Sequence, residues 1–226
     1  MKIAVVVQGR FHALELMQGL IAAGHDATLF INYPALALER MGLPAKYVRS
    51  FTLHGVLSRL LRGQKYEPFL SKLFGWWAAR AVRKQRWDLI HVFSTAAEEM
   101  LRARPGRGEV IDVMRGCSHI RTQDQLVTDE AARVGAPMGR PYEWTMQREE
   151  REYALADRVV ALSRFAWQSF IDQGTPKEKV LCLPLAAELP LFAGAPADIA
   201  ARAARIRAGG RLRLLFVGSV SYRKGA

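Results

Sequence analysis

Residues 2–31, KIAVVVQGRFHALELMQGLIAAGHDATLFI, decide the fold of this chain. Two short apolar runs, Lys2–Val7 and Asp26–Ile31, are typical of strands buried in a parallel sheet. Between them, apolar residues recur at helical spacing over Ala13–Ile21, and Gly24 stands where a C-terminal cap is expected. The stretch is therefore a β-α-β unit, which builds a right-handed crossover between parallel strands.

The same alternation continues along the chain. A helix is predicted over Thr95–Arg102, with Ser94 or Thr95 as its N-cap, and another follows Ser163 and ends near Gly174. Further strands are predicted at Trp87–Phe93, Glu109–Val113, Asp157–Leu162 and Lys179–Leu183. Together these elements predict an α/β domain with a Rossmann-like, doubly wound parallel sheet.

Composition limits the class of protein. The chain has 226 residues, of which 50% are hydrophobic and 24% are charged, and its mean hydropathy is −0.02. These values exclude a disordered or collagen-like chain. The sequence contains no uncharged apolar run long enough to span a membrane, and its first apolar stretch is too short for a signal peptide. Cys117 and Cys182 stand far apart, which argues against a disulfide framework or a thiolate metal site. A cytoplasmic location is therefore expected.

The charge balance suggests an anionic partner. The chain has 33 Lys and Arg residues against 21 Asp and Glu residues, which gives a net charge of +12 and a pI of about 10.2. Phosphate groups, nucleic acid and an acidic membrane surface all fit such a balance. Nucleic acid is disfavoured because no binding motif supports it. An arginine-rich composition inherited from a GC-rich genome is the alternative explanation.

Residues 56–87 concentrate this charge. They contain eight Lys and Arg residues against the single acid Glu67, interleaved with leucine and aromatic residues. Two interpretations stay open: a basic amphipathic helix that lies in an anionic membrane interface, or an apolar stripe that packs on the sheet with its cations in solvent. In the first interpretation, the membrane-facing residues are Arg59, Arg62, Lys72, Trp76, Trp77 and Arg80.

Several chemistries are excluded by the glycine and histidine positions. Gly9 follows the first strand, where helix N-termini offer N–H groups to anions, but the other glycines of the dinucleotide fingerprint are absent. A nicotinamide cofactor is therefore disfavoured. None of the five histidines has a metal-binding spacing, so no catalytic metal is expected. His119 differs from the others because it ends the loop Arg115–His119 after a predicted strand, where active-site residues collect.

A charged helix is predicted before Ala156. Glu149 and Glu152 share one face of it, and Arg148 and Arg151 are interspersed with them. A carboxylate pair can do acid–base chemistry, but the arginines favour a solvated, ion-paired helix surface.

The last part of the chain predicts a strand without neighbours. A helix is expected over Ala195–Arg207, and Leu212–Val217 then reads as a new buried strand. Arg223 and Lys224 follow in a stretch that lacks the Ser or Thr of a P-loop, so an NTPase is disfavoured, but the two cations can bind a diphosphate. We expect a domain over residues 1–194, a linker helix over 195–210, and the first strand and loop of a truncated second domain over 211–226.

Several segments, in this order, carry a family resemblance: Gly9-Arg10-Phe11, Trp87–His91, Arg115–Ile120 with Gln123, Ser163-Arg164-Phe165, Pro176–Pro184, Glu188 with Phe192, and Phe216–Gly225. With this order and spacing, the sequence resembles the N-terminal domain of a retaining glycosyltransferase of family 4, which has the GT-B fold. The resemblance implies two Rossmann-like domains with a cleft between them. It also implies metal-independent transfer of a sugar from a UDP- or GDP-sugar to an acceptor hydroxyl, with no cofactor.

The resemblance also implies roles for single residues. His119 would approach the transferred sugar as the catalytic residue. The donor diphosphate would be bound by Gly9, Arg10, Arg223 and Lys224. The acceptor would be bound by Arg115, Ser118, Gln123 and Arg164. The basic segment over residues 56–87 motivates the further expectation that the acceptor is a cell-envelope glycan or glycolipid, reached from the inner face of the membrane.

The sequence departs from the family pattern at three positions. Cys117 replaces a usual serine, Ala186 replaces a glycine, and Ser219 stands where the family has arginine. The paired glutamates that contact the donor in this family do not occur before Ala226, so this chain alone is expected to be inactive. The runner-up interpretation is a non-catalytic Rossmann-like module for an anionic ligand or partner, with residues 212–217 paired in its own sheet.

Overall fold

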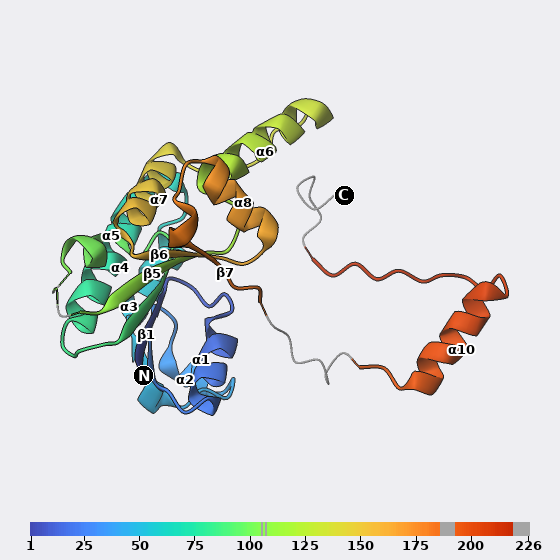
Figure 1. Ribbon diagram of the computed structural model, residues 1–226, viewed down its shortest axis with the longest axis horizontal. Coiled ribbons are helices and arrows are strands. Elements are labelled where there is room, and N and C mark those ends of the chain that lie inside the picture. Colours follow the sequence, from blue (N-terminus) through green and yellow to red (C-terminus); the bar gives the residue numbers. More distant parts are fainter. Residues whose placement is uncertain (105, 107, 186–192, 219–226) are drawn as a thin grey trace.

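A parallel sheet lies at the centre of the computed structural model, which describes residues 1–104, 106, 108–185 and 193–218 (Figure 1). Its strand order is β3-β2-β1-β4-β5-β6-β7, and every neighbouring pair is parallel. The chain runs from β1 outward to β3, then returns to the other side of β1 and continues from β4 to β7, which confirms the predicted Rossmann-like sheet. The strands are β1 (Lys2–Val7), β2 (Asp26–Ile31), β3 (Val48–Ser50), β4 (Leu89–Phe93), β5 (Val110–Arg115), β6 (Arg158–Ala161) and β7 (Val180–Cys182).

Strand β1 shows why its sequence is a continuous apolar run. Ala4 and Val6 face one hydrophobic cluster, and Ile3, Val5 and Val7 face a second cluster on the other side of the sheet. All five side chains are buried, because helices cover both faces of this strand.

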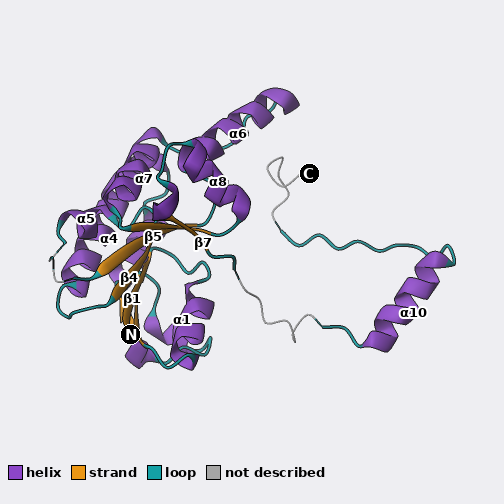
Figure 2. Ribbon diagram, viewed as in Figure 1, coloured by secondary structure: helices purple, strands orange, loops and turns teal. Residues whose placement is uncertain are grey.

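Helices form a layer on each face of the sheet (Figure 2). One face is covered by α1 (Ala13–Ala22) and α2 (Ala35–Glu39). Buried residues on the other face come from α4 (Glu67–Val82), α5 (Glu98–Arg102), α7 (Glu143–Leu155) and α8 (Arg164–Asp172). The remaining helices are α3 (Thr52–Leu60), α6 (Ile120–Val134) and α10 (Pro196–Arg207), with short 3-10 turns at Ala45–Tyr47, Gln64–Tyr66 and Lys177–Lys179.

Three elements differ from the sequence-based predictions. The short strand β3 was not predicted, because its three residues carry no readable alternation. The helix after β4 begins at Glu98 rather than near Thr95, since Thr95 has a φ of 72° and cannot open a right-handed helix. The basic segment is split into α3 and α4, between which Gly63 has a φ of 107°.

The predicted linker helix is present as α10, which buries none of its residues and lies apart from the sheet in Figure 1. The strand expected at Leu212–Val217 is not formed: within the described part of the chain, these residues pair with no strand. Leu214, Leu215 and Val217 are 85–89% exposed. A strand needs a neighbour for its hydrogen bonds, and none of the described strands lies beside this segment. The expected division into domains stays a prediction.

Candidate functional site

The carboxyl edge of the sheet is the candidate site. Because all strands are parallel, the loops after β1, β4, β5 and β6 leave the sheet at the same edge, and the strand order reverses between β1 and β4. Phe11 and Thr95, with φ values of 40° and 72°, are the non-glycine residues with left-handed backbone among those described. They follow β1 and β4, the two strands at the switch point. Strained residues of this kind collect at binding sites, where the surroundings hold them in place.

The loop after β1 is fixed by its neighbour strand. Gly9 has a φ of 98°, and its N–H donates to Asn32 Oδ1 at 2.7 Å. This amide is therefore already engaged by the protein, although Gly9 was predicted to face the donor phosphates. Arg10 is exposed, with Nη1 3.5 Å from Met41 Sδ. Phe11 is 68% exposed, and the centroids of the Phe11 and Phe93 rings are 6.0 Å apart.

A buried relay behind this loop was missed by the sequence analysis. Asn32 Nδ2 lies 3.2 Å from His54 Nδ1, and His54 Nε2 lies 3.0 Å from the Leu70 carbonyl oxygen. The carbonyl can only accept, so His54 carries its proton on Nε2 and accepts from Asn32 on Nδ1. Burial lowers the pKa of His54, which keeps the ring neutral. The close approach of α3 to Asn32 requires glycine at position 55, because a Cβ on Gly55 would lie 2.2 Å from the Asn32 carbonyl oxygen.

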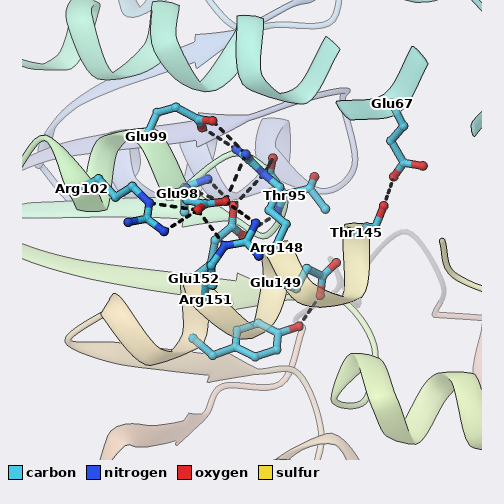
Figure 3. Close-up of polar contacts among 12 residues, drawn as sticks. Glu67, Thr95, Glu98, Glu99, Arg102, Thr145, Arg148, Glu149, Arg151 and Glu152 are labelled. Carbon is cyan, nitrogen blue, oxygen red and sulfur yellow. Dashed lines mark hydrogen bonds and ion pairs between the residues drawn. The ribbon is translucent and has the colours of Figure 1, made fainter. Parts of the chain in front are cut away.

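Helix α7 holds the loop after β4 through hydrogen bonds to the backbone of that loop (Figure 3). The Thr95 N–H donates to Glu152 Oε2 at 2.7 Å, and the Thr95 carbonyl accepts from Arg148 Nε at 2.9 Å. Glu152 Oε1 also accepts from the amides of Ala97 and Glu98 at 2.9 and 3.1 Å. The strained residue is thus held at both of its backbone groups, and the carboxylate caps α5 in place of Ser94 or Thr95.

The prediction of a solvated α7 surface is wrong. Arg148 and Glu152 are fully buried, and Glu149 is 2% exposed. Burial is possible because acids and bases neutralise each other: Arg148 Nη1 is 2.8 Å from Glu99 Oε1, and Arg151 Nε is 2.8 Å from Glu98 Oε1. Burial raises the pKa of Glu152, while Arg148 and the amide donors act against that rise.

Two predicted acceptor-binding residues meet after β5. Arg115 Nη2 donates to Gln123 Oε1 at 2.7 Å, which links the end of β5 to α6. Arg115 Nε also pairs with Glu149 Oε2 at 2.8 Å, and the Tyr153 hydroxyl donates to the same carboxylate. The Arg115 side chain is 13% exposed, so most of it is enclosed by the protein.

His119 is a buried, neutral N-cap. Its Nδ1 accepts from the Arg121 N–H at 3.2 Å, and its own N–H donates to Ser169 Oγ at 2.8 Å. The ring packs against Tyr153 and Phe170, with centroid distances of 5.2 and 5.1 Å. Burial lowers the pKa of His119 to about 4, so at neutral pH the ring carries one proton, on Nε2. His119 is therefore a hydrogen-bond donor and not a base.

The other predicted site residues are dispersed. Ser118 is buried beside His119, and Arg164 is exposed at the start of α8, whose N-cap is Ser163 through its Oγ and the Ala166 amide. Arg223 and Lys224 lie outside the described residues.

The predicted membrane-facing residues divide into two groups. Trp77 is half-buried and packs on Phe51 and Phe74, at centroid distances of 5.1 and 5.5 Å, so it faces the core. Trp76 is 60% exposed, and the cations around it are also exposed. The exposed members of the predicted set are Arg59, Arg62, Lys72, Trp76 and Arg80. None of the helices in the described ranges is long and apolar enough to cross a membrane.

Comparison with known families agrees with this geometry. The model of Glycosyltransferase Family 4 matches residues 10–187. The chain belongs to this family. The match covers β2 to β7 and every described site residue except Gly9, and it confirms the resemblance seen in the sequence. No curated protein sequence matches this family member.

Solved structures share the fold. The UDP-GlcNAc 2-epimerase of Neisseria meningitidis, bound to UDP-GlcNAc, has a TM-score of 0.52 and 11% identity over 80% of this chain and 45% of its own. HepE of Anabaena, in complex with UDP, has a TM-score of 0.50 and 18% identity over 92% of this chain and 50% of its own. The corresponding epimerase of Methanocaldococcus jannaschii, in complex with UDP-GlcNAc and UDP, has a TM-score of 0.52 and 11% identity over 80% of this chain and 46% of its own. The family member described here spans about half the length of these structures.

Proposed function

We propose that the protein is the acceptor-side part of a glycosyltransferase that moves a sugar from a UDP- or GDP-sugar to an acceptor hydroxyl with retention of configuration. The observation that carries the proposal is the state of His119 at the carboxyl edge: neutral, fixed through Nδ1, and left with an N–H donor. Membership of glycosyltransferase family 4 supports the reaction class. The UDP and UDP-GlcNAc bound to proteins of similar fold support a nucleotide-sugar as donor.

The chemistry of such a transfer fits the edge of this sheet. Negative charge develops on the departing nucleoside diphosphate, and fixed N–H donors and cations stabilise it. In this proposal His119 donates to the transferred sugar, and Arg10 lies on the side of the departing diphosphate. Arg115 and Gln123, joined at 2.7 Å, form part of the acceptor site with Ser118 and Arg164.

A second, donor-binding domain completes the enzyme in this proposal. Leu212–Val217 is its first strand, and Arg223 and Lys224 bind the diphosphate. The exposed leucines of this stretch support the proposal, because an apolar segment of this kind needs a sheet to enter. Residues 1–226 alone are then expected to turn over no substrate. The non-catalytic module would need residues 212–217 in its own sheet, and in the described chain they pair with no strand.

The acceptor in this proposal is a cell-envelope glycan or glycolipid, which the enzyme reaches as a peripheral protein on the cytoplasmic face of a membrane. The support is a surface on α3 and α4 that combines exposed apolar side chains with exposed cations. Leu53, Val56 and Leu60 recur at helical spacing on α3 and are 51–72% exposed, and Phe69 on α4 is 54% exposed. A globular protein rarely leaves such a stripe in water without a partner.

The test is an assay of the gene product translated past the codon for Ala226. With a panel of UDP- and GDP-sugars and total envelope glycolipid as acceptor, we expect transfer from one donor, without added metal. Nuclear magnetic resonance of the product should show the donor's anomeric configuration. Inversion of configuration would contradict retention, and the absence of both transfer and donor hydrolysis across the panel would contradict the proposed function.

A further inference from the structure

A groove of about 480 Å³ lies between α4 and α5, away from the carboxyl edge. Its lining includes Trp76, Arg80, Arg83, Lys84 and Glu99. Arg80, Arg83 and Lys84 stand at the end of α4 or just after it, where the chain approaches the amino end of β4, so these three cations lie toward the edge opposite His119. The cations of the groove therefore lie away from the candidate sugar-transfer site, while its acid Glu99 belongs to the ion-pair set behind that site.

Its charge is positive and uncompensated. Arg80, Arg83 and Lys84 are exposed, and none of them has an acidic partner within the described ranges. The one acid in the lining, Glu99, is already paired with the buried Arg148. The C-terminal end of α4 carries a partial negative charge, which favours a cation in the last turn. This partial charge is too small to neutralise the three positive charges of Arg80, Arg83 and Lys84. An anionic ligand would relieve this repulsion.

An aromatic side chain stands at the rim. Trp76 is 60% exposed, and Arg80 lies over its ring at 6.0 Å from the centroid. Phe69 lies two turns earlier on α4, and α3 packs beside α4 with its own exposed leucines. In Figure 1 the helices α3, α4 and α5 follow one another along one side of the molecule. Cations beside exposed Trp, Phe and Leu match a ligand that is anionic at one end and apolar at the other.

We propose that the groove binds the phosphate of an anionic phospholipid, with Trp76 in the interface and the α3–α4 stripe against the acyl region. This inference deepens the membrane association proposed above and rests on it. Arginine and lysine recognise a phosphodiester through charge-assisted hydrogen bonds, and the tryptophan ring prefers the headgroup level of a bilayer. A nucleic acid would use the cations but would leave the aliphatic stripe in water, so the lipid is favoured.

The experiment is co-sedimentation of the intact protein with vesicles at low ionic strength. Vesicles of equal parts phosphatidylglycerol and phosphatidylcholine are compared with vesicles of phosphatidylcholine alone. The test variant is Arg80→Gln/Arg83→Gln/Lys84→Gln, and the matched control is Arg202→Gln/Arg205→Gln/Arg207→Gln on α10, which loses the same charge from another exposed helix.

We expect the protein to bind phosphatidylglycerol vesicles and the groove variant to bind about 100-fold more weakly. The α10 control should lose no more than about twofold, which is a long-range effect of charge. Trp76→Ala should weaken binding while leaving the circular dichroism spectrum unchanged. Equal losses in the two triple variants would overturn the groove assignment and leave membrane association standing.

Other outcomes separate the alternatives. If the intact protein does not bind phosphatidylglycerol vesicles, the groove assignment and the membrane association are both wrong. The proposal of sugar transfer does not depend on this result. If calorimetry shows inorganic phosphate bound by the intact protein and not by the groove variant, with equal vesicle binding, the groove is a site for a free anion and the lipid is overturned. Loss of single-stranded RNA binding in the groove variant, again with equal vesicle binding, would overturn it in favour of nucleic acid.

Discussion

Helix α7 and the pair α3–α4 are both rich in charge, and the structure treats them in opposite ways. On α7, Arg148, Glu149 and Glu152 are buried, whereas the cations of α3 and α4 are in solvent. The two regions differ in their ratio of acidic to basic residues. Helix α7 brings acids and bases together and meets two more acids on α5, so its charges are paired when they leave water. Residues 56–87 have eight bases and one acid, and no burial of that set could be compensated.

The largest expected effect comes from removing one partner of the buried set. Arg148→Met leaves the carboxylates of Glu98, Glu99 and Glu152 without their common cation. We expect a loss of about 3–5 kcal/mol in the free energy of unfolding, measured by urea denaturation. Arg133→Gln on α6, which removes an exposed ion pair with Glu130, is the control and should leave the unfolding midpoint unchanged. If Arg148→Met is as stable as the control, the contrast between the two regions is wrong.

The next effect concerns the close approach of α4 to this set. A Cβ on Gly75 would lie 1.9 Å from Glu99 Oε2, so Gly75→Ala must displace the carboxylate that Arg148 binds. We expect a loss of about 2 kcal/mol by thermal unfolding. Gly19→Ala, in α1 with nothing within 4 Å of its Cβ, should instead gain about 0.5–1 kcal/mol from helix propensity. Equal effects at the two glycines would contradict the packing described here.

Titration of His119 gives an effect of similar size that depends on pH and has a defined sign. Its pKa is about 4 in the folded protein and near 6.5 when unfolded, so the unfolded chain binds more protons between these values. Stability should therefore fall as the pH falls from about 6.5 to 4, by about 2.5 kcal/mol from this residue. His119→Asn keeps an N-cap acceptor for Arg121 but cannot titrate, and its unfolding free energy should vary less across that window. A parallel pH dependence in both proteins would exclude His119 as its source.

The smallest effect on stability is expected from the exposed cations of α3 and α4. Arg59→Gln and Lys72→Gln remove charges that form no ion pair with any residue in the described ranges. Their free energies of unfolding should stay within about 0.5 kcal/mol of the unchanged protein in chemical denaturation. A loss above that range would show that these side chains are held by contacts that the structure does not contain.

These regions also show how far the sequence predicts the structure. The bounds of β1 and β2 follow from their apolar runs, because a buried parallel strand leaves no other choice for such residues. The burial of α7 could not be predicted, since charges at i, i+3 and i+4 look the same on a solvated helix and on one whose partners stand some 50 residues away.

The candidate site also contains residues that could be predicted from the sequence and residues that could not. Arg115, Gln123 and His119 could be predicted, because they follow a readable strand and match a family motif. The relay from Gly9 through Asn32 to His54 could not, since its members are separated by more than 20 residues and lie in no motif. An asparagine directly after β2 and a His-Gly pair were the only signals in the sequence.

In the proposed transfer, the carboxyl edge of the sheet presents the His119 N–H to the sugar. The most direct test is the transfer activity of the gene product translated past Ala226, with and without His119→Ala. Because an N–H donor aimed at developing charge contributes on the order of 100-fold to the rate, we expect kcat to fall by about that factor. Donor KM should change little, and circular dichroism should show an intact fold. Unchanged kcat in a folded His119→Ala enzyme would contradict the account.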